Sequence, residues 1–166
     1  MRFIELFAGI GGFRLGLERQ GHQCVWTSEW LPRPRGIYQY NFGEMPDDRD
    51  IRTVPASAVP GADLIVGGFP CATFSVAGKR TGFGLEDTRG TLCFEMLRIA
   101  HERHIPYILF ENVKGLLNHD RGKTFHIILC ALDEMGYDCQ WEVLDSQYFG
   151  VPQHRERLFL IANLRG

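Results

Sequence analysis

Short apolar runs alternate with amphipathic stretches along almost the whole chain. β-Branched and aromatic residues are concentrated at 2–7, 23–28, 62–66, 107–110, 139–144 and 157–162, and runs of this length and composition are typical of strands. Apolar residues with helical spacing predict helices over 13–21, 36–42, 91–102 and 125–135, and Gly136 is suited to the C-terminus of the last one. Strands that alternate with helices indicate an α/β fold, with a mostly parallel sheet covered by helices on both faces.

The size and composition of the chain agree with one domain over residues 1–166. The 166 residues are 45% hydrophobic and 23% charged, which is ordinary for a globular domain. No apolar stretch approaches the roughly 18 residues that a membrane span needs, so we expect no membrane association and a cytoplasmic protein. The net charge of -2 gives no basic face of the kind that a self-sufficient nucleic-acid binder shows.

The five cysteines differ in their surroundings. They form no CxxC pair and have no close histidine partner, which predicts neither a disulfide framework nor a metal site. Four of them lie among apolar neighbours, and we expect these to be inert core residues: Cys24, Cys93, Cys130 and Cys139. Cys71 instead follows Gly67-Gly68-Phe69-Pro70 at the end of a predicted strand, which is the setting of an exposed and reactive thiol.

Candidate ligand-binding residues follow several predicted strands. The glycine turn 9–12, Glu29, the Pro70-Cys71 segment and Glu111 should meet at the carboxyl edge of the sheet, where such folds bind ligands. The turn does not complete the dinucleotide fingerprint, because Arg14 occupies the third glycine position; other adenosine-containing ligands remain open. The alternatives are a plain tight turn beside an exposed acid, a structural Pro-Cys turn, and a surface acid at 111 that caps the following helix.

Several motifs, in order along the chain, resemble those of the cytosine carbon-5 DNA methyltransferases. They are the segment 3–13, Phe69-Pro70-Cys71, the segment 84–94, Glu111-Asn112-Val113 and Gln153-His154-Arg155-Glu156-Arg157. The resemblance covers nearly the whole chain and implies a Rossmann-like, S-adenosylmethionine-dependent methyltransferase fold, here incomplete. It also implies that no metal takes part.

The same resemblance implies which residues bind S-adenosylmethionine. The turn should wrap the methionine part, Glu29 should hold the ribose, Trp30 should stack on adenine, and Asp50 with Ile51 should contact the adenine edge. The full implied set is Phe7, Ala8, Gly9, Gly11, Gly12, Phe13, Glu29, Trp30, Asp50, Ile51, Pro70 and Leu92. The alternatives are ordinary partial burial for Trp30 and a helix or turn cap for Asp50.

The chemistry implied by the resemblance is covalent. Carbon 5 of cytosine is a poor nucleophile, so a thiolate first adds to carbon 6 of a base that has been flipped out of the duplex. The implied catalytic residues are Cys71, Glu111, Arg155 and Arg157, and the implied substrate contacts are Phe69, Pro70, Ser75, Asn112, Val113 and Gln153. The glycine-rich segment 77–90 would close over the DNA. Arg155 and Arg157 alternate on one strand and should face the same side, although both could simply be solvated charges.

The chain departs from the family pattern at two places. Ala72 follows the cysteine where members usually have glutamine, which affects DNA contact more than thiolate chemistry. The chain also stops at Gly166, where members continue into a target-recognition region, so we expect a split subunit, a truncated product or an excerpt. Its partners would be double-stranded DNA and a second polypeptide or missing C-terminal segment. A bacterial restriction-modification system, with the protein at the nucleoid, is the expected setting. The competing hypotheses are an RNA (tRNA) cytosine methyltransferase and a nonenzymatic remnant that binds a cofactor or partner.

Overall fold

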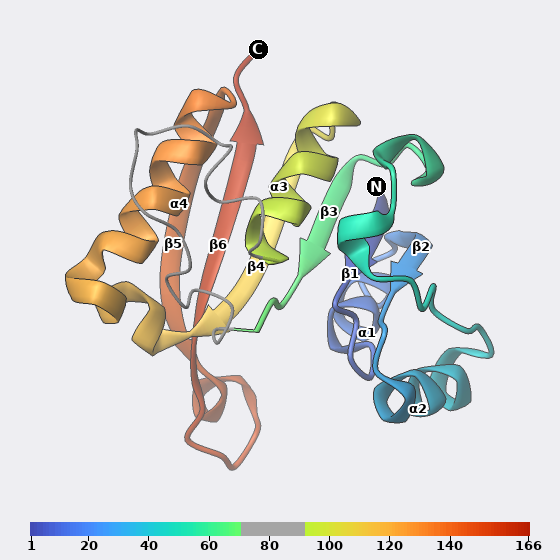
Figure 1. Cartoon of the computed structure of the whole chain (residues 1–166). Coiled ribbons are helices and arrows are strands. Elements are labelled where there is room, and N and C mark those ends of the chain that lie inside the picture. Colours follow the sequence, from blue (N-terminus) through green and yellow to red (C-terminus); the bar gives the residue numbers. More distant parts are fainter. Residues whose placement is uncertain (71–91) are drawn as a thin grey trace.

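A computed structural model describes residues 1–70 and 92–166 of the chain (Figure 1). The strands are β1 (Arg2–Leu6), β2 (Gln23–Ser28), β3 (Leu64–Gly67), β4 (Tyr107–Val113), β5 (Tyr137–Asp145) and β6 (Glu156–Leu164). The helices are α1 (Gly12–Glu18), α2 (Pro32–Phe42), α3 (Leu92–Glu102) and α4 (Lys123–Glu134). Short 3-10 segments at Ile51–Thr53, Ala56–Ala58, Lys114–Gly122 and Ser146–Phe149 complete the order.

The strands form one six-stranded sheet in the order β2-β1-β3-β4-β6-β5. The first four of these pair in parallel, as predicted, whereas β6 is antiparallel to both β4 and β5. The sheet is therefore mostly parallel, and its one reversed strand is the last in the chain. The short connection from β5 to β6 explains the reversal, since a parallel pair would need a crossover of a dozen or more residues.

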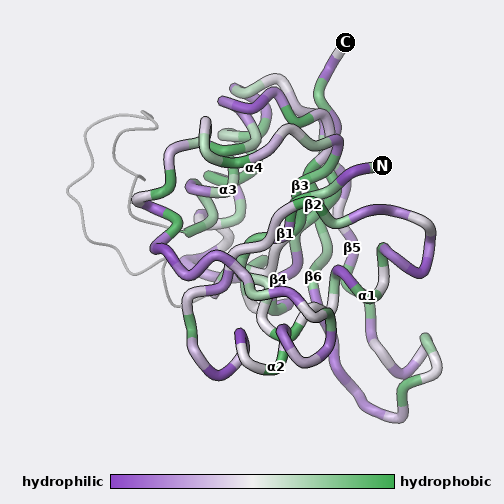
Figure 2. The backbone as a smooth tube through the Cα atoms, turned by 90° about the vertical axis from the view of Figure 1, so that its right-hand side faces the viewer, coloured by the Kyte–Doolittle hydropathy of each residue, from purple (hydrophilic) through white to green (hydrophobic). Residues whose placement is uncertain are grey.

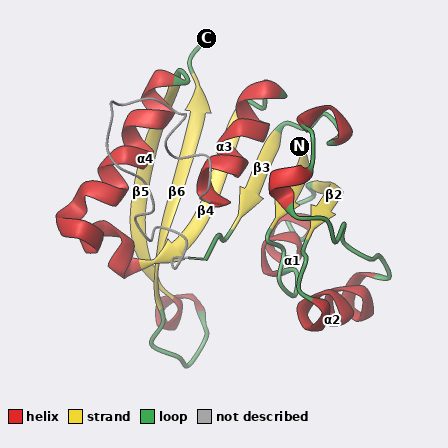
Figure 3. Cartoon of the chain, viewed as in Figure 1, coloured by secondary structure: helices red, strands yellow, loops and turns green. Residues whose placement is uncertain are grey.

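The hydrophobic core has two layers, one on each face of the sheet. The larger layer lies between the sheet and the helices α3 and α4, which Figure 3 shows on the same side of the strands. The smaller layer joins Phe3, Leu64 and Val66 to Phe13 and Leu17 of α1 on the opposite face. Figure 2 shows the hydrophobic colour gathered along the interior strands, with hydrophilic segments at the periphery. The carboxyl ends of β1, β3 and β4 meet at one edge of this core.

Several boundaries differ from the sequence prediction. Helix α2 begins at Pro32 rather than near residue 36, because proline is well accepted in the first helical turn. Strand β4 continues to Val113, so Glu111 lies within the strand and not after it. Gly136 follows α4 with φ of 86°, as expected for the residue that ends a helix. Among the described residues, no helix combines the length and the apolar character that a bilayer span requires.

Candidate active site

The turn between β1 and α1 has a backbone that only glycine accommodates easily. Gly9 and Gly11 have φ of 58° and 90°, and the Gly11 amide donates to the Ala8 carbonyl at 2.8 Å. A Cβ atom added at Gly11 would lie 2.1 Å from the Phe42 ring of α2. The glycines therefore let the turn form and let α2 approach it closely.

Glu29, which follows β2, is held against this turn. Its carboxylate accepts from the Gly9 amide and from the Leu31 amide, each at 2.9 Å, and the side chain is buried. Each carboxylate oxygen keeps a further lone pair for another donor. The carboxylate is therefore oriented by the protein but retains the capacity to bind a ligand.

A cavity of about 180 Å³ opens beside Glu29. Its lining combines one buried acid with aromatic, apolar and arginine side chains: Phe7, Ser28, Glu29, Trp30, Arg49, Asp50, Ile51, Arg52 and Leu92. The structure thus brings together six residues that the sequence assigned to the cofactor, although they come from four separate segments. Ala8, Gly9, Gly11 and Gly12 form the turn that follows Phe7.

Two of the predicted cofactor residues lie away from this cavity. Phe13 packs in the smaller core layer, and its ring meets Phe159 edge-to-face at 6.5 Å between centroids. Pro70 is exposed in the segment after β3 and does not line the cavity. The structure therefore separates these two side chains from the six that converge.

For Asp50 the alternative to cofactor binding is a helix or turn cap, and for Trp30 it is ordinary partial burial. Asp50 does cap the 3-10 segment Ile51–Thr53, because its carboxylate accepts from the Arg52 amide at 3.0 Å, and it lines the cavity as well. The Arg52 guanidinium beside it lowers the pKa of Asp50. The Trp30 side chain is half exposed at the cavity, so it offers a ring face for stacking.

A buried polar network lies beneath the glycine turn. Glu5 on β1 accepts from the Tyr38 hydroxyl at 3.2 Å and from the Arg14 amide at 3.3 Å. The Arg14 side chain bonds Glu44 at 2.8 Å and Glu18 at 2.9 Å. Burial raises the pKa of Glu5 to about 7, although its hydrogen bonds act in the opposite direction. Arg14, which breaks the dinucleotide fingerprint, also donates to the Tyr38 hydroxyl at 3.3 Å and thus joins α1 to α2 in this fold.

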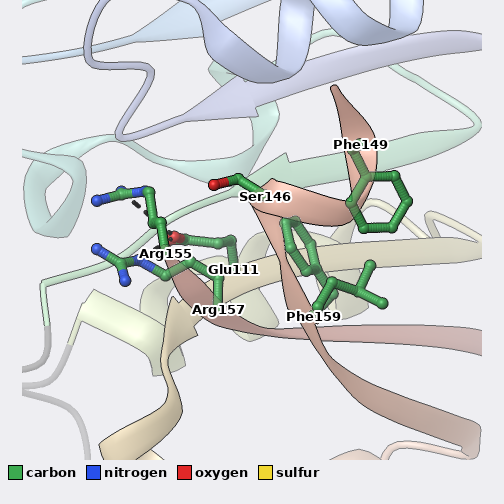
Figure 4. A pocket seen from close by; sticks show the side chains of 7 residues that line it. Glu111, Ser146, Phe149, Arg155, Arg157 and Phe159 are labelled. Atoms are coloured by element: carbon green, nitrogen blue, oxygen red, sulfur yellow. Dashed lines mark ion pairs between the residues drawn. The ribbon is translucent and has the colours of Figure 1, made fainter. Parts of the chain in front are cut away.

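The second cavity, of about 330 Å³, contains the predicted catalytic acid (Figure 4). Arg157 forms an ion pair with a Glu111 oxygen at 2.8 Å, and Arg155 lies 3.9 Å from the same oxygen. Both arginines therefore face one side, as their alternation predicts. The other Glu111 oxygen faces Gly68, where an added Cβ atom would lie only 3.1 Å away.

The cap interpretation of Glu111 is wrong. The segment that follows β4 has Val113 at its N-cap and no side-chain cap bond, and the Glu111 carboxylate pairs with arginine instead. The same contact shows that Arg157 is an ion-pair partner and not merely a solvated charge. Glu111 is consequently held in a fixed orientation at the carboxyl edge, within reach of the backbone that precedes Cys71.

Asn112 joins β4 to that backbone. Its side-chain amide donates to the Phe69 carbonyl at 2.9 Å, and its side-chain oxygen accepts from the Val113 amide at 2.8 Å. Asn112 is buried, and the Phe69 ring packs on Phe110 in the core. Both side chains therefore position the segment, and their contact with substrate stays a prediction. Cys71, Ser75 and the proposed lid 77–90 lie outside the described residues.

Val113 and Gln153 lie at the exposed end of the same region. Val113 is 38% exposed at the end of β4, opposite Arg157 in the strand register. Gln153 is exposed in the loop between β5 and β6, where its carbonyl accepts from the Ser146 hydroxyl at 2.6 Å. Their side chains are accessible, and their predicted contact with substrate remains untested.

Part of the lining of both cavities was not predicted from the sequence. The unpredicted lining residues are Ser28, Arg49 and Arg52 in the first, and Leu144, Ser146, Phe149 and Phe159 in the second. Some signal was present, since Phe159 is two residues from Arg157 on a strand and must share its face. Ser146 and Phe149 gave no such signal, because they reach the cavity through a loop.

The four described cysteines are less uniform than predicted. Cys93 is fully buried, and burial raises its pKa. Cys24 is only partly buried, yet desolvation still raises its pKa to about 11. Cys130 and Cys139 are also partly buried, and the Cys130 sulfur lies 3.5 Å from the His126 ring on α4. Within residues 1–70 and 92–166, no cluster of three or more histidine, cysteine or acidic residues could hold a metal ion.

Comparisons with known proteins agree with this geometry. The family model of the C-5 cytosine-specific DNA methylases matches residues 1–166. The chain is 43% identical to the type II methyltransferase M.HhaI of Haemophilus parahaemolyticus, over 97% of this chain and 48% of that protein. It is 46% identical to the type II methyltransferase M.NgoBI of Neisseria gonorrhoeae, over 95% of this chain and 49% of that protein.

Solved structures give the same result. The crystal structure of a Spodoptera frugiperda DNMT2 mutant superimposes with a TM-score of 0.79 at 25% identity, covering 98% of this chain and 50% of that one. The chain spans about half the length of the curated relatives that it matches. The motifs, the two cavities and the match over every residue lead to one assignment: the chain belongs to the C-5 cytosine-specific DNA methylase family.

Proposed function

We propose that the chain is the catalytic portion of a DNA (cytosine-5-)-methyltransferase that uses S-adenosylmethionine and belongs to a restriction-modification system. Both relatives described above are named type II methyltransferases. The observation that carries the proposal is the position of Glu111, which an arginine holds at 2.8 Å beside the backbone that leads to Cys71. The proposal places the protein in the cytoplasm, at the DNA.

The first cavity fits the adenosine part of S-adenosylmethionine. Glu29 would accept hydrogen bonds from ribose hydroxyls, and the half-exposed Trp30 ring would stack on adenine. The glycine turn would present its backbone to the methionine part, since no side chains obstruct it at Gly9 or Gly12. When bound, S-adenosylmethionine supplies an electrophilic methyl group at its sulfonium.

The second cavity fits a flipped cytosine. Glu111 would bond ring nitrogen 3, and Arg155, which is half exposed, would contact the base. Cys71 would add to carbon 6 as a thiolate, and carbon 5 would thereby gain the electron density that methylation needs. Once carbon 5 has taken the methyl group, which leaves the sulfonium as a neutral thioether, a base would remove the proton from carbon 5, and elimination would break the bond to Cys71 and restore the thiolate.

Covalent trapping on 5-fluorocytosine tests this proposal. Duplex DNA that contains the analogue should form an adduct with the chain, assembled with the polypeptide that completes the enzyme, in the presence of S-adenosylmethionine, because fluorine cannot leave as a proton does. The adduct should be lost in Cys71→Ser and retained in Cys130→Ser, a matched control on α4. Retention in Cys71→Ser, or no adduct although S-adenosylmethionine binds, would contradict the covalent mechanism. A tRNA substrate in parallel tests the RNA alternative.

We also propose that further polypeptide, in the same chain or in a second subunit, completes the enzyme and recognises the target sequence. The relatives are about twice as long as the part they share with this chain. The face of the sheet opposite α3 and α4 keeps apolar side chains in solvent, with Tyr107 of β4 42% exposed and Ile161 of β6 51% exposed. Exposed apolar area of this kind is suited to burial against another segment.

A charge placed on that face tests the covering segment. Ile161→Lys should weaken assembly with the other half and lower DNA methylation, while S-adenosylmethionine binding to the first cavity persists. Ile127→Lys on α4, where the side chain is 39% exposed, is the matched control and should assemble normally. Normal assembly of Ile161→Lys would show that this face does not hold the missing polypeptide.

A further inference from the structure

The loop between β5 and β6, residues 146–155, is fastened at its two ends by one carboxylate. Asp145, the last residue of β5, is buried. One of its oxygens accepts from the Arg155 amide at 2.9 Å and from the Gln147 amide at 3.2 Å. The other accepts from the Gln147 side chain at 2.9 Å and from the His154 ring.

These four contacts join the beginning of the loop to its end. Residue 147 lies two positions after the end of β5, in the 3-10 segment Ser146–Phe149, whereas residues 154 and 155 directly precede β6. Two further bonds run in parallel, from the Ser146 amide to the Arg155 carbonyl at 3.2 Å and from the Ser146 hydroxyl to the Gln153 carbonyl at 2.6 Å. Desolvation would raise the pKa of Asp145, but the two amides and the His154 ring hold the pKa below its ordinary value. The carboxylate is therefore charged while it holds the loop.

The position of Arg155 depends on this closure. Its backbone amide is bonded to Asp145, and its guanidinium lies 3.9 Å from Glu111 on the neighbouring strand β4. Ser146 and Phe149 of the same loop line the cavity that contains Glu111, as Figure 4 shows. By contrast, Arg157 lies within β6, where the ladders to β4 and β5 already fix its backbone.

We infer that Asp145 is a positioning residue for the base-binding site: it closes the loop 146–155 so that Arg155 faces Glu111, and His154 strengthens that closure. The inference rests on the proposed function, because Arg155 matters only if a base occupies the second cavity. It adds a residue to the site that neither contacts the base nor belongs to the motifs of the sequence. His154 is the loop residue whose side chain reaches Asp145. That side chain is otherwise in solvent, with 71% of its surface exposed.

Amide exchange tests the closure without any substrate. In Asp145→Ala, the Arg155 and Gln147 amides should exchange roughly ten- to a hundredfold faster by NMR, as expected when a hydrogen bond to a charged group is lost. Asp138→Ala is the matched control, because Asp138 lies on the same strand but is exposed and pairs only at 3.7 Å with Arg165. Unchanged exchange in Asp145→Ala would overturn the inference, whatever the chain's activity.

A double-mutant cycle then tests whether Asp145 acts through Arg155. Asp145→Ala should lower kcat/KM for DNA roughly ten- to a hundredfold, with little change in the affinity for S-adenosylmethionine. Combined with Arg155→Ala, it should add nothing, because the side chain that it positions is gone. Additive losses would show a merely structural role and refute the inference.

A second variant covers the case in which Asp145→Ala does not fold. Asp145→Asn then replaces it, because asparagine still accepts from both amides but cannot accept from the Gln147 side chain. It should give the same non-additivity with a smaller loss. If the chain, assembled with the polypeptide that completes the enzyme, methylates no cytosine, the proposed function fails, and the exchange experiment alone decides whether Asp145 holds the loop.

Discussion

The burial of Glu5 predicts that its contribution to the stability of the fold falls as pH rises toward neutrality. Glu5 is 1% exposed on β1, and its only described side-chain donor is the Tyr38 hydroxyl at 3.2 Å. Burial raises its pKa from 4.5 to about 7. Since a tenfold change in proton affinity is worth about 1.4 kcal/mol, the difference amounts to about 3 kcal/mol of folding free energy.

The direction of the change in stability with pH follows from the proton that Glu5 keeps in the folded chain. Between pH 4.5 and about 7, the folded chain keeps the proton on Glu5, whereas the unfolded chain has lost it. The stabilisation is therefore complete below pH 4.5 and is lost progressively as pH rises to about 7. The Cys24 thiol, which interacts electrostatically with Glu5, stays neutral throughout because burial raises its pKa to about 11. Arg14 stays charged in this window.

Glu5→Gln removes the titrating proton and keeps a hydrogen-bonding side chain. The free energy of unfolding of wild type should fall relative to Glu5→Gln by about 3 kcal/mol across this window. Urea unfolding followed by circular dichroism at several pH values measures the difference. Glu102→Gln, on the exposed side of α3, controls for the loss of one carboxylate. A difference between wild type and Glu5→Gln that is constant with pH would refute the reasoning.

Three further substitutions, with Gly16→Ala as a control, test the two cavities and the backbone between them. Gly11→Ala should weaken S-adenosylmethionine binding and cost more than about 1 kcal/mol, because its Cβ would meet a ring of α2 at 2.1 Å. Gly16→Ala on α1 has open space and should be neutral or stabilising by calorimetry. Gly68→Ala should lower methyl transfer but not cofactor affinity, since its Cβ would lie 3.1 Å from a Glu111 oxygen; an unchanged kcat would contradict this. Asn112→Ala should destabilise by about 1–3 kcal/mol in urea, because it removes a buried hydrogen bond to the Phe69 carbonyl.

The sequence predicted the elements whose signal is local. The strand before the glycine turn and the helices α3 and α4 are encoded by periodicity, and their predicted limits lie within a few residues of those observed. Strand direction is not local information, so the reversal of β6 was not predicted. A clue existed, because the segment between β5 and β6 has no helical pattern and is too short for a parallel crossover.

In the candidate site, too, residues in local motifs could be predicted, whereas contacts between distant segments could not. Family resemblance identified Glu29, Trp30 and Leu92, and the structure gathers them in one cavity. The network of Glu5 and Arg14 could not be predicted, because its bonds join three elements whose packing no single segment specifies. Asp145 was missed for a related reason: in sequence it is one acid at a strand end, and its role appears only when the loop closes on it.

This chain alone holds the walls of the first cavity, whereas the second cavity lies beside an exposed face. This difference predicts that the chain can bind the cofactor without being able to transfer the methyl group. The first cavity lies beside β1 and β2, where Glu29 is fixed by two backbone amides and the glycine turn packs against α2. The second lies on β4 and β6, beside the face where Ile161 is half exposed. Binding of S-adenosylmethionine should therefore be a property of this chain alone. Methyl transfer should depend on the polypeptide that covers the exposed face, because that polypeptide would also confine Arg155 and the base.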